Sequence, residues 1–170
     1  MAEEEQNTQP NGQAGNAAEQ SEVQMSLQHI YLKDCSFEAK SPHEIDQTAG
    51  DPAINLNLAQ RTTEFGGGRW EVVLTVTVTS KQAEKTIFVS EVQYGGLFQF
   101  DNFNDQQLQY AINVLCPNVL YPYNRAKISD LVVSGGFFLP PMQPINFEAV
   151  FRQRLEEARN KENGNAAQDN

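Results

Sequence analysis

Histidine, cysteine and tryptophan are scarce in this chain, whose 170 residues include two His, two Cys and one Trp. His29 and His43 stand alone, without the spacing of a metal-binding motif. Cys35 and Cys116 lie far apart, which favours a reducing compartment over a disulfide framework. We therefore expect no metal site and no cofactor.

Basic residues are also few, because Lys and Arg total 12 against 22 Asp and Glu, a formal net charge of −10. A negative field of this size repels phosphate backbones and acidic lipid surfaces, which argues against nucleic acid as a partner. The N-terminus lacks a basic stretch followed by an apolar one, and no apolar run approaches the length of a membrane span. The expected location is the cytoplasm, without direct membrane insertion.

The two ends of the chain lack large apolar side chains. Residues 1–22 hold five Glu and neither Lys nor Arg, and residues 156–170 end in a polar, Asn-rich run. Such segments bury too little apolar surface to offset the entropy of ordering. We predict an acidic, disordered leader over 1–22, one folded domain over 23–155 and a mobile tail over 156–170.

Inside the predicted domain, apolar and polar residues first alternate with the period of a β-strand. The predicted strands cover 25–38, 54–59, 70–79 and 87–94. The alternation slips at Tyr31 and Leu32, which indicates a bulge. Short connections, including the glycines at 66–68, favour an antiparallel, meander-like sheet.

The period then changes to that of a helix. Asn104 with Gln107 resembles a capping box, and the helix that follows must break or kink at Pro117. A second helical stretch covers about 126–133, and Asn146 is a good N-cap for a last helix. The prediction is an α+β fold, a four-stranded antiparallel sheet with one kinked helix and one C-terminal helix packed on one side.

A sheet covered by helices on one side has a second face that should be polar. Here the second face is expected to carry Val73, Ile87 and Val89 among Glu and Thr, and the second strand adds an exposed apolar row. Two interpretations stay open, namely a slightly apolar surface, which is common, and a face for assembly or binding.

No catalytic arrangement emerges from the sequence. Asp34 and Glu38 are four residues apart on a strand, about 13 Å, which exceeds the spacing of paired carboxylates in glycoside hydrolysis. No base stands next to a nucleophile, so a hydrolase that uses acidic residues and Cys116 is an alternative with little support. We expect a protein that is not an enzyme.

Five segments, taken in order, resemble the SecB family of bacterial protein-export chaperones. They are Ile30-Tyr31-Leu32-Lys33-Asp34 with Ser36-Phe37-Glu38-Ala39, the segment 70–74, the segment 88–98, Cys116-Pro117-Asn118-Val119-Leu120-Tyr121-Pro122-Tyr123 with Arg125, and the segment 144–151. The resemblance implies an ATP-independent chaperone, a homotetramer built as a dimer of dimers. Such a chaperone binds unfolded precursor proteins, keeps them competent for translocation and delivers them to the SecA translocase motor.

The resemblance also implies roles for particular residues. Matching positions imply a SecA-binding surface at Asp34, Glu38, Val89 and Glu91, and positions that support the oligomer at Ser90, Val92 and Tyr94. Strand alternation independently places Val89 and Glu91 on one face.

For the client-binding groove, Ile54, Leu56 and Leu58 match an apolar row in the family. Phe147 and Phe151 are further candidates from the last helix, for which plain core packing stays equally open. The loop 135–141 differs from the commoner family sequence, so its role in client contact is left undecided. The alternative function is a SecB-like general or antitoxin-linked holdase that is not coupled to export.

Overall fold

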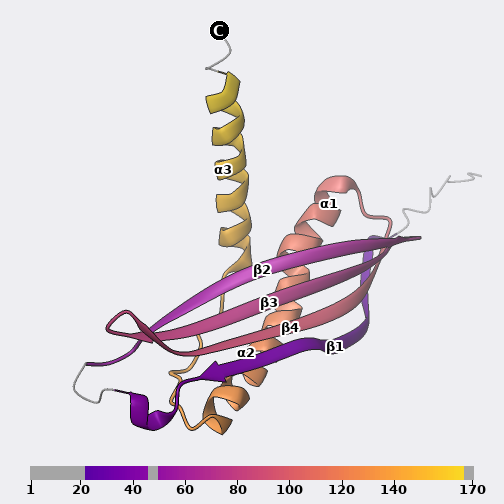
Figure 1. Cartoon of the computed structure of the whole chain (residues 1–170). Coiled ribbons are helices and arrows are strands. Elements are labelled where there is room, and N and C mark those ends of the chain that lie inside the picture. The colour runs from indigo at the N-terminus through magenta and orange to yellow at the C-terminus, as the bar shows by residue number, and fades with distance from the viewer. Residues whose placement is uncertain (1–21, 46–49, 167–170) are drawn as a thin grey trace, which may run out of the picture.

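The predicted α+β fold, a four-stranded antiparallel sheet with helices, is present in the computed structural model, which describes residues 22–45 and 50–166 (Figure 1). All but the last residue of the predicted leader, 1–22, lies outside the described residues. The elements are β1 Gln24–Ala39, a 3-10 turn Pro42–Glu44, β2 Ala53–Gly66, β3 Arg69–Gln82, β4 Lys85–Asp101, α1 Asp105–Tyr110, a π-helical segment Ala111–Leu115, α2 Cys116–Ser134 and α3 Phe147–Ala166.

The sheet has the strand order β1-β4-β3-β2, with every neighbouring pair antiparallel. Strands β2, β3 and β4 form the predicted meander, and the glycines at 66–68 all take a positive φ at its first turn. Strand β1 pairs with β4 instead of β2, so β1 and β2 occupy the two edges. Strand β2 is longer than the predicted 54–59, because polar residues on both of its faces hide the alternation beyond that point.

Register shifts decide which way several side chains point. The slip predicted near Tyr31 and Leu32 is present as a shift between Leu32 and Asp34, and a second shift lies between Leu27 and His29. Another shift, at the end of the β3–β4 pairing, corrects the prediction for Ile87. Ile87 is 5% exposed and belongs to the core, rather than to the polar face.

The hydrophobic core lies between one face of the sheet and helix α2. Strand β3 supplies a row of Val and Leu, strand β4 supplies Phe88, Val92 and Phe98, and α2 supplies Leu120 and Ile128. All of these side chains are 2% exposed or less. Burial of each large apolar side chain contributes about 1.5–3 kcal/mol, so this single sheet–helix layer dominates the stability.

The helix before the core begins at the predicted capping box. The Gln107 N–H donates to Asn104 Oδ1 at 2.9 Å, and the Asn104 N–H donates to Gln107 Oε1 at 3.0 Å. The irregularity predicted at Pro117 takes the form of the π-helical segment, in which the Cys116 N–H bonds to the Ala111 carbonyl. A wider turn next to Pro117 accommodates its missing N–H and its ring, so the chain continues as α2 instead of breaking.

Helix α3 begins on the same side of the sheet as α2, where the Ala149 N–H donates to the predicted N-cap, Asn146 Oδ1, at 3.0 Å. Only its beginning is packed, because Phe147 is buried, Phe151 is half-buried and residues 152–160 are exposed. Beyond that point α3 extends away from the sheet (Figure 1). The helix continues into the predicted tail 156–170 as far as Ala166, and the mobility of that tail stays a prediction.

A substitution at Gly96 tests how closely β4 packs against α2. A Cβ at this position would lie 2.5 Å from Phe98 Cε2 and 3.1 Å from Leu120 Cδ2. We expect Gly96→Ala to lower the free energy of unfolding by about 1–3 kcal/mol, because the methyl group overpacks the core. Urea unfolding followed by circular dichroism measures this, with Thr86→Ala at the exposed start of β4 as the control. A midpoint equal to that of the wild type would contradict the packing described.

Candidate functional site

The apolar row of β2 lies at an uncovered edge of the core. Ile54, Leu56 and Leu58 are paired with Ser80, Val78 and Val76 of β3, so all three side chains point to the side of the sheet that carries the helices. Helix α2 packs over β3 and β4, and β2 is an edge strand. Ile54 is therefore 38% exposed and Leu56 is 41% exposed.

The loop between α2 and α3 forms the facing wall. The Tyr121 hydroxyl donates to the Gln143 carbonyl at 2.9 Å, and Arg125 Nη1 donates to the Met142 carbonyl at 3.2 Å. The ring of Phe137 packs against Phe88 of β4, with centroids 5.3 Å apart. These contacts hold an irregular, proline-rich segment in place beside the sheet.

Two hollows separate the loop from the strands. The first, of about 440 Å³, is lined by Ile45, Asp51, Pro52, Ile54, Ser80, Ile87, Phe88, Phe137, Phe138 and Pro140. The second, of about 330 Å³, is lined by Ile54, Leu56, Tyr121, Leu139, Pro140, Pro141, Met142, Gln143, Pro144 and Ile145. They share Ile54 and Pro140, so together they form one strip, which we call the apolar groove.

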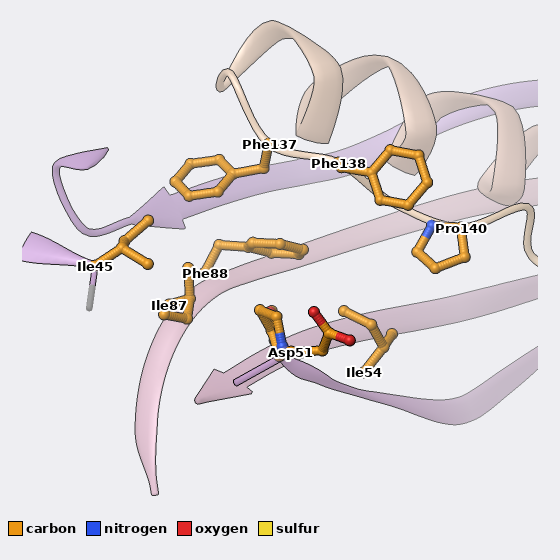
Figure 2. A pocket seen from close by; sticks show the side chains of 10 residues that line it. Ile45, Asp51, Ile54, Ile87, Phe88, Phe137, Phe138 and Pro140 are labelled. Atoms are coloured by element: carbon orange, nitrogen blue, oxygen red, sulfur yellow. The ribbon is translucent and has the colours of Figure 1, made fainter. Parts of the chain in front are cut away.

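Figure 2 shows the first hollow, with Phe137, Phe138 and Pro140 of the loop facing side chains of the strands. Phe138 is 81% exposed, an unusual state for a large aromatic side chain. Asp51 adds a carboxylate to the lining, on a segment held by a hydrogen bond of 2.6 Å from Gln82 Nε2 to the Gly50 carbonyl. An open, mainly apolar strip of this kind can bind an extended apolar segment of a polypeptide.

The predicted groove residues divide between two places. Ile54 and Leu56 line the apolar groove, whereas Leu58, Phe147 and Phe151 line a separate hollow of only about 10 Å³. A hollow of that volume is too small for a ligand. For both phenylalanines the structure therefore matches core packing, one of the two interpretations left open. The loop residues 137–145 were missed, although the run Phe-Phe-Leu-Pro-Pro-Met without a helical period is a signal for them.

The other face of the sheet is covered by none of the described helices, and it carries the predicted SecA-binding residues. In the β1–β4 pairing, Asp34 is opposite Gln93, Ser36 is opposite Glu91 and Glu38 is opposite Val89. Partners in a ladder point to the same face, so Asp34, Glu38, Val89 and Glu91 lie together. Asp34 and Glu38 are exposed, whereas Val89 and Glu91 are half-buried. We call these four residues the acidic patch.

Hydrogen bonds hold Glu91 within the patch. Its Oε2 accepts from Thr77 Oγ1 at 2.9 Å, and its Oε1 accepts from Gln93 Nε2 at 3.2 Å. Both donors lie on the neighbouring positions of the same face, as the register requires. The carboxylate is therefore fixed in place as part of a flat surface.

A second polar cluster lies further along the same face. The ring of Tyr31 crosses Gly95, where a Cβ would lie 2.7 Å from Tyr31 Cζ, and its hydroxyl donates to Glu71. Lys33 Nζ forms an ion pair of 2.8 Å with Glu71 Oε1. Burial raises the pKa of Tyr31 to about 12, and hydrogen bonds from Lys33 and Tyr31 lower the pKa of Glu71.

The sequence pattern predicts that Val73 adds apolar surface to this face. This prediction is wrong, because the cluster covers Val73. Tyr31, Gly95, Val73 and Arg61 are successive partners across the four strands. Val73 lies next to the ring that covers Gly95 and is 2% exposed. Of the three apolar residues expected on this face, only Val89 stays partly exposed, whereas Ile54 and Leu56 on the groove side are 38% and 41% exposed.

The residues predicted to support the oligomer face the opposite way, towards helix α2. Ser90 and Val92 are fully buried, and the ring of Tyr94 lies 5.6 Å from that of Tyr123 on α2. None of the three forms part of the acidic patch. A role in assembly would have to act through the position of α2.

The thiol of Cys116 is poorly suited to nucleophilic chemistry. Cys116 is fully buried in the core, and burial raises the pKa of its thiol, which disfavours the reactive thiolate. Within the described ranges, no three His, Cys, Asp or Glu side chains are grouped as metal ligands. The described part of the chain also contains no helix long and apolar enough to cross a membrane.

Comparison with known sequences connects this architecture to a family. Residues 18–158 match the family model SecB, described as preprotein translocase subunit SecB. The protein-export protein SecB of Hahella chejuensis is 41% identical over 131 residues, which cover 77% of this chain and 82% of that protein. That of Alkalilimnicola ehrlichii is 38% identical over 163 residues, which cover 94% of this chain and 87% of that protein.

A solved structure agrees in fold. A SecB-like chaperone of Mycobacterium tuberculosis, in complex with a peptide from an antitoxin, has a TM-score of 0.56 and 16% identity, over 71% of this chain and 89% of that chain. The likeness at this identity concerns the fold alone, whereas the sequence matches extend over most of the chain. The chain belongs to the SecB family of preprotein translocase subunits.

Proposed function

We propose that this SecB-family chaperone of protein export holds unfolded precursor polypeptides in the apolar groove and delivers them to the SecA motor through the acidic patch. The observation that carries the proposal is the continuous apolar strip between Ile54, Leu56 and the loop 137–145. A strip without a closed pocket suits clients that have many apolar stretches and no fixed shape. Holding requires no ATP, and the proposed site of action is the cytoplasm.

The binding energy that one groove can supply favours weak, repeated contacts. Each large client side chain that becomes buried there contributes about 1.5–3 kcal/mol, and association costs at least several kcal/mol. One groove should therefore release its client readily. A homotetramer, proposed from the family, would present four such grooves and raise the effective affinity by multivalency.

Strand β2 offers a second source of binding energy. As an edge strand, β2 has one side whose backbone N–H and C=O groups have no partner strand among the described residues. An extended client segment can pair with this edge while its side chains enter the groove. Hydrogen bonds to the backbone do not depend on client sequence, which suits a chaperone with many clients.

The acidic patch supports delivery as a separate step. Asp34, Glu38 and Glu91 lie on the helix-free face, and the groove opens on the side that carries α2. A client in the groove therefore leaves the patch accessible. Acidic groups on a flat surface favour rapid, salt-sensitive association with a basic partner surface, here assigned to SecA.

A general or antitoxin-linked holdase is the second candidate function. The neighbour from Mycobacterium tuberculosis is a SecB-like chaperone bound to an antitoxin peptide. The same groove would serve either role, so the groove does not discriminate between them. The acidic patch favours export, because a holdase without a delivery step has no need of a second surface.

Client capture tests the groove. We expect Leu56→Asp and Phe138→Ser each to reduce the arrest of refolding of a slow-folding precursor at least several-fold, because they remove apolar contact area from the groove. Refolding of the denatured precursor, followed by fluorescence with increasing chaperone, measures the effect.

Phe65→Ser is the matched control for Phe138→Ser. Phe65 is 54% exposed at the β2–β3 turn and lies outside the lining of the groove. It should arrest refolding as the wild type does. Equal arrest by Leu56→Asp, Phe138→Ser and the wild type would refute the groove assignment.

SecA titration tests the acidic patch. We expect Glu38→Lys or Glu91→Lys to weaken SecA binding about tenfold or more at low salt, because each places a cation against a basic surface, while client capture is retained. The control is Glu64→Lys, the same charge change at an exposed β2 position paired with Trp70, on the other face. Binding by the patch variants as tight as by the control would contradict the assignment.

A further inference from the structure

The bulge in β1 places a cationic side chain beside the acidic patch. Because of the register shift between Leu32 and Asp34, Lys33 is the extra residue of β1, next to a residue of the patch. The ion pair of Lys33 with Glu71 shows that the lysine side chain lies on the helix-free face. Without that pair, a flexible ammonium would be free to reach the neighbouring Asp34 and neutralise part of the patch.

Along the sheet, Glu71 and the rest of the acidic patch lie on opposite sides of Asp34. In the ladder, Asp34, Gln93 and Thr75 form one row across the strands, and Glu71 is four residues from Thr75 along β3. That separation is about 13 Å along the strand. The patch extends from the same row in the opposite direction, through Glu91 to Glu38.

Glu71 is itself firmly held. Its side chain is 12% exposed and accepts hydrogen bonds from Lys33 Nζ and from the hydroxyl of Tyr31. The tyrosine ring reaches across β4 to Glu71 because Gly95 presents no Cβ in its path. The same two donors lower the pKa of Glu71, which keeps it ionised and able to hold the lysine.

We propose that Glu71 is a positioning residue for the partner-binding face, which holds the Lys33 ammonium away from the acidic patch and so keeps the patch anionic. The inference rests on the proposed function of that patch. It adds a residue that lies outside the patch and acts through Lys33. Glu71 thereby sets how strongly a basic partner surface is recognised.

The experiment compares Glu71→Gln, Lys33→Gln and the double variant in SecA titrations at low salt. We expect Glu71→Gln to weaken binding about three- to tenfold, because the released lysine screens Asp34. Lys33→Gln should bind at least as tightly as the wild type. The double variant should recover wild-type affinity, since the lysine that causes the loss is gone.

Two controls separate position from net charge. Glu64→Gln removes one negative charge from the other face and should cost less affinity than Glu71→Gln. The second control combines Glu71→Gln with Lys127→Gln, a change on α2 at the helix side of the sheet. This double variant has the same net charge as Glu71→Gln combined with Lys33→Gln. It should not recover SecA affinity. Urea midpoints and client capture are measured for each variant, because a purely structural role of Glu71 would lower both without rescue by Lys33→Gln.

The possible results distinguish the positioning role of Glu71 from the partner-binding role of the acidic patch. If Asp34→Asn and Glu91→Gln weaken SecA binding but Glu71→Gln does not, the positioning role is wrong and the patch stands. The role is also wrong if the Lys33 double variant stays as weak as Glu71→Gln. If Asp34→Asn and Glu91→Gln bind SecA as the wild type does, the proposed partner site itself is wrong.

Discussion

Packing of one helical layer against one face of the sheet is the interaction on which the rest of the molecule depends. An α-helix is about 10 Å wide, whereas four strands place the outer strand axes roughly 14 Å apart. Helix α2 covers the central strands β3 and β4, so the edge strand β2 keeps its apolar row partly exposed. The apolar groove is a direct consequence of that mismatch, because the loop 137–145 borders the gap without filling it.

The same sheet separates two kinds of chemistry. Strand alternation sends Phe88, Ser90 and Val92 into the core and sends Val89 and Glu91 to the helix-free face. A polypeptide in the groove and a protein on the acidic patch would therefore contact opposite sides of one thin layer. Under the proposed function, charge would select a partner on one side, and apolar area would retain a client on the other.

The sequence predicted more of the fold than of the site. Alternation located four strands, the capping box located α1, and the slip at Leu32 located a bulge, because each depends on neighbouring residues. The pairing of β1 with β4 and the burial of Ile87 depend on residues distant in the chain. The loop residues of the groove were missed for the same reason, since an apolar loop becomes a wall only when Tyr121 and Arg125 hold it beside β2.

The fold class, the family and the sides on which Val89 and Glu91 lie could all be predicted from the sequence, because they follow from period, motif and alternation. Tertiary structure alone decided that Ile54 and Leu56 line an open groove while Phe147 and Phe151 pack into a filled one. It also decided that Tyr31 crosses Gly95 to reach Glu71. The exposure of a side chain and the contacts between strands depend on residues that are distant in the sequence. A local sequence pattern therefore cannot predict them.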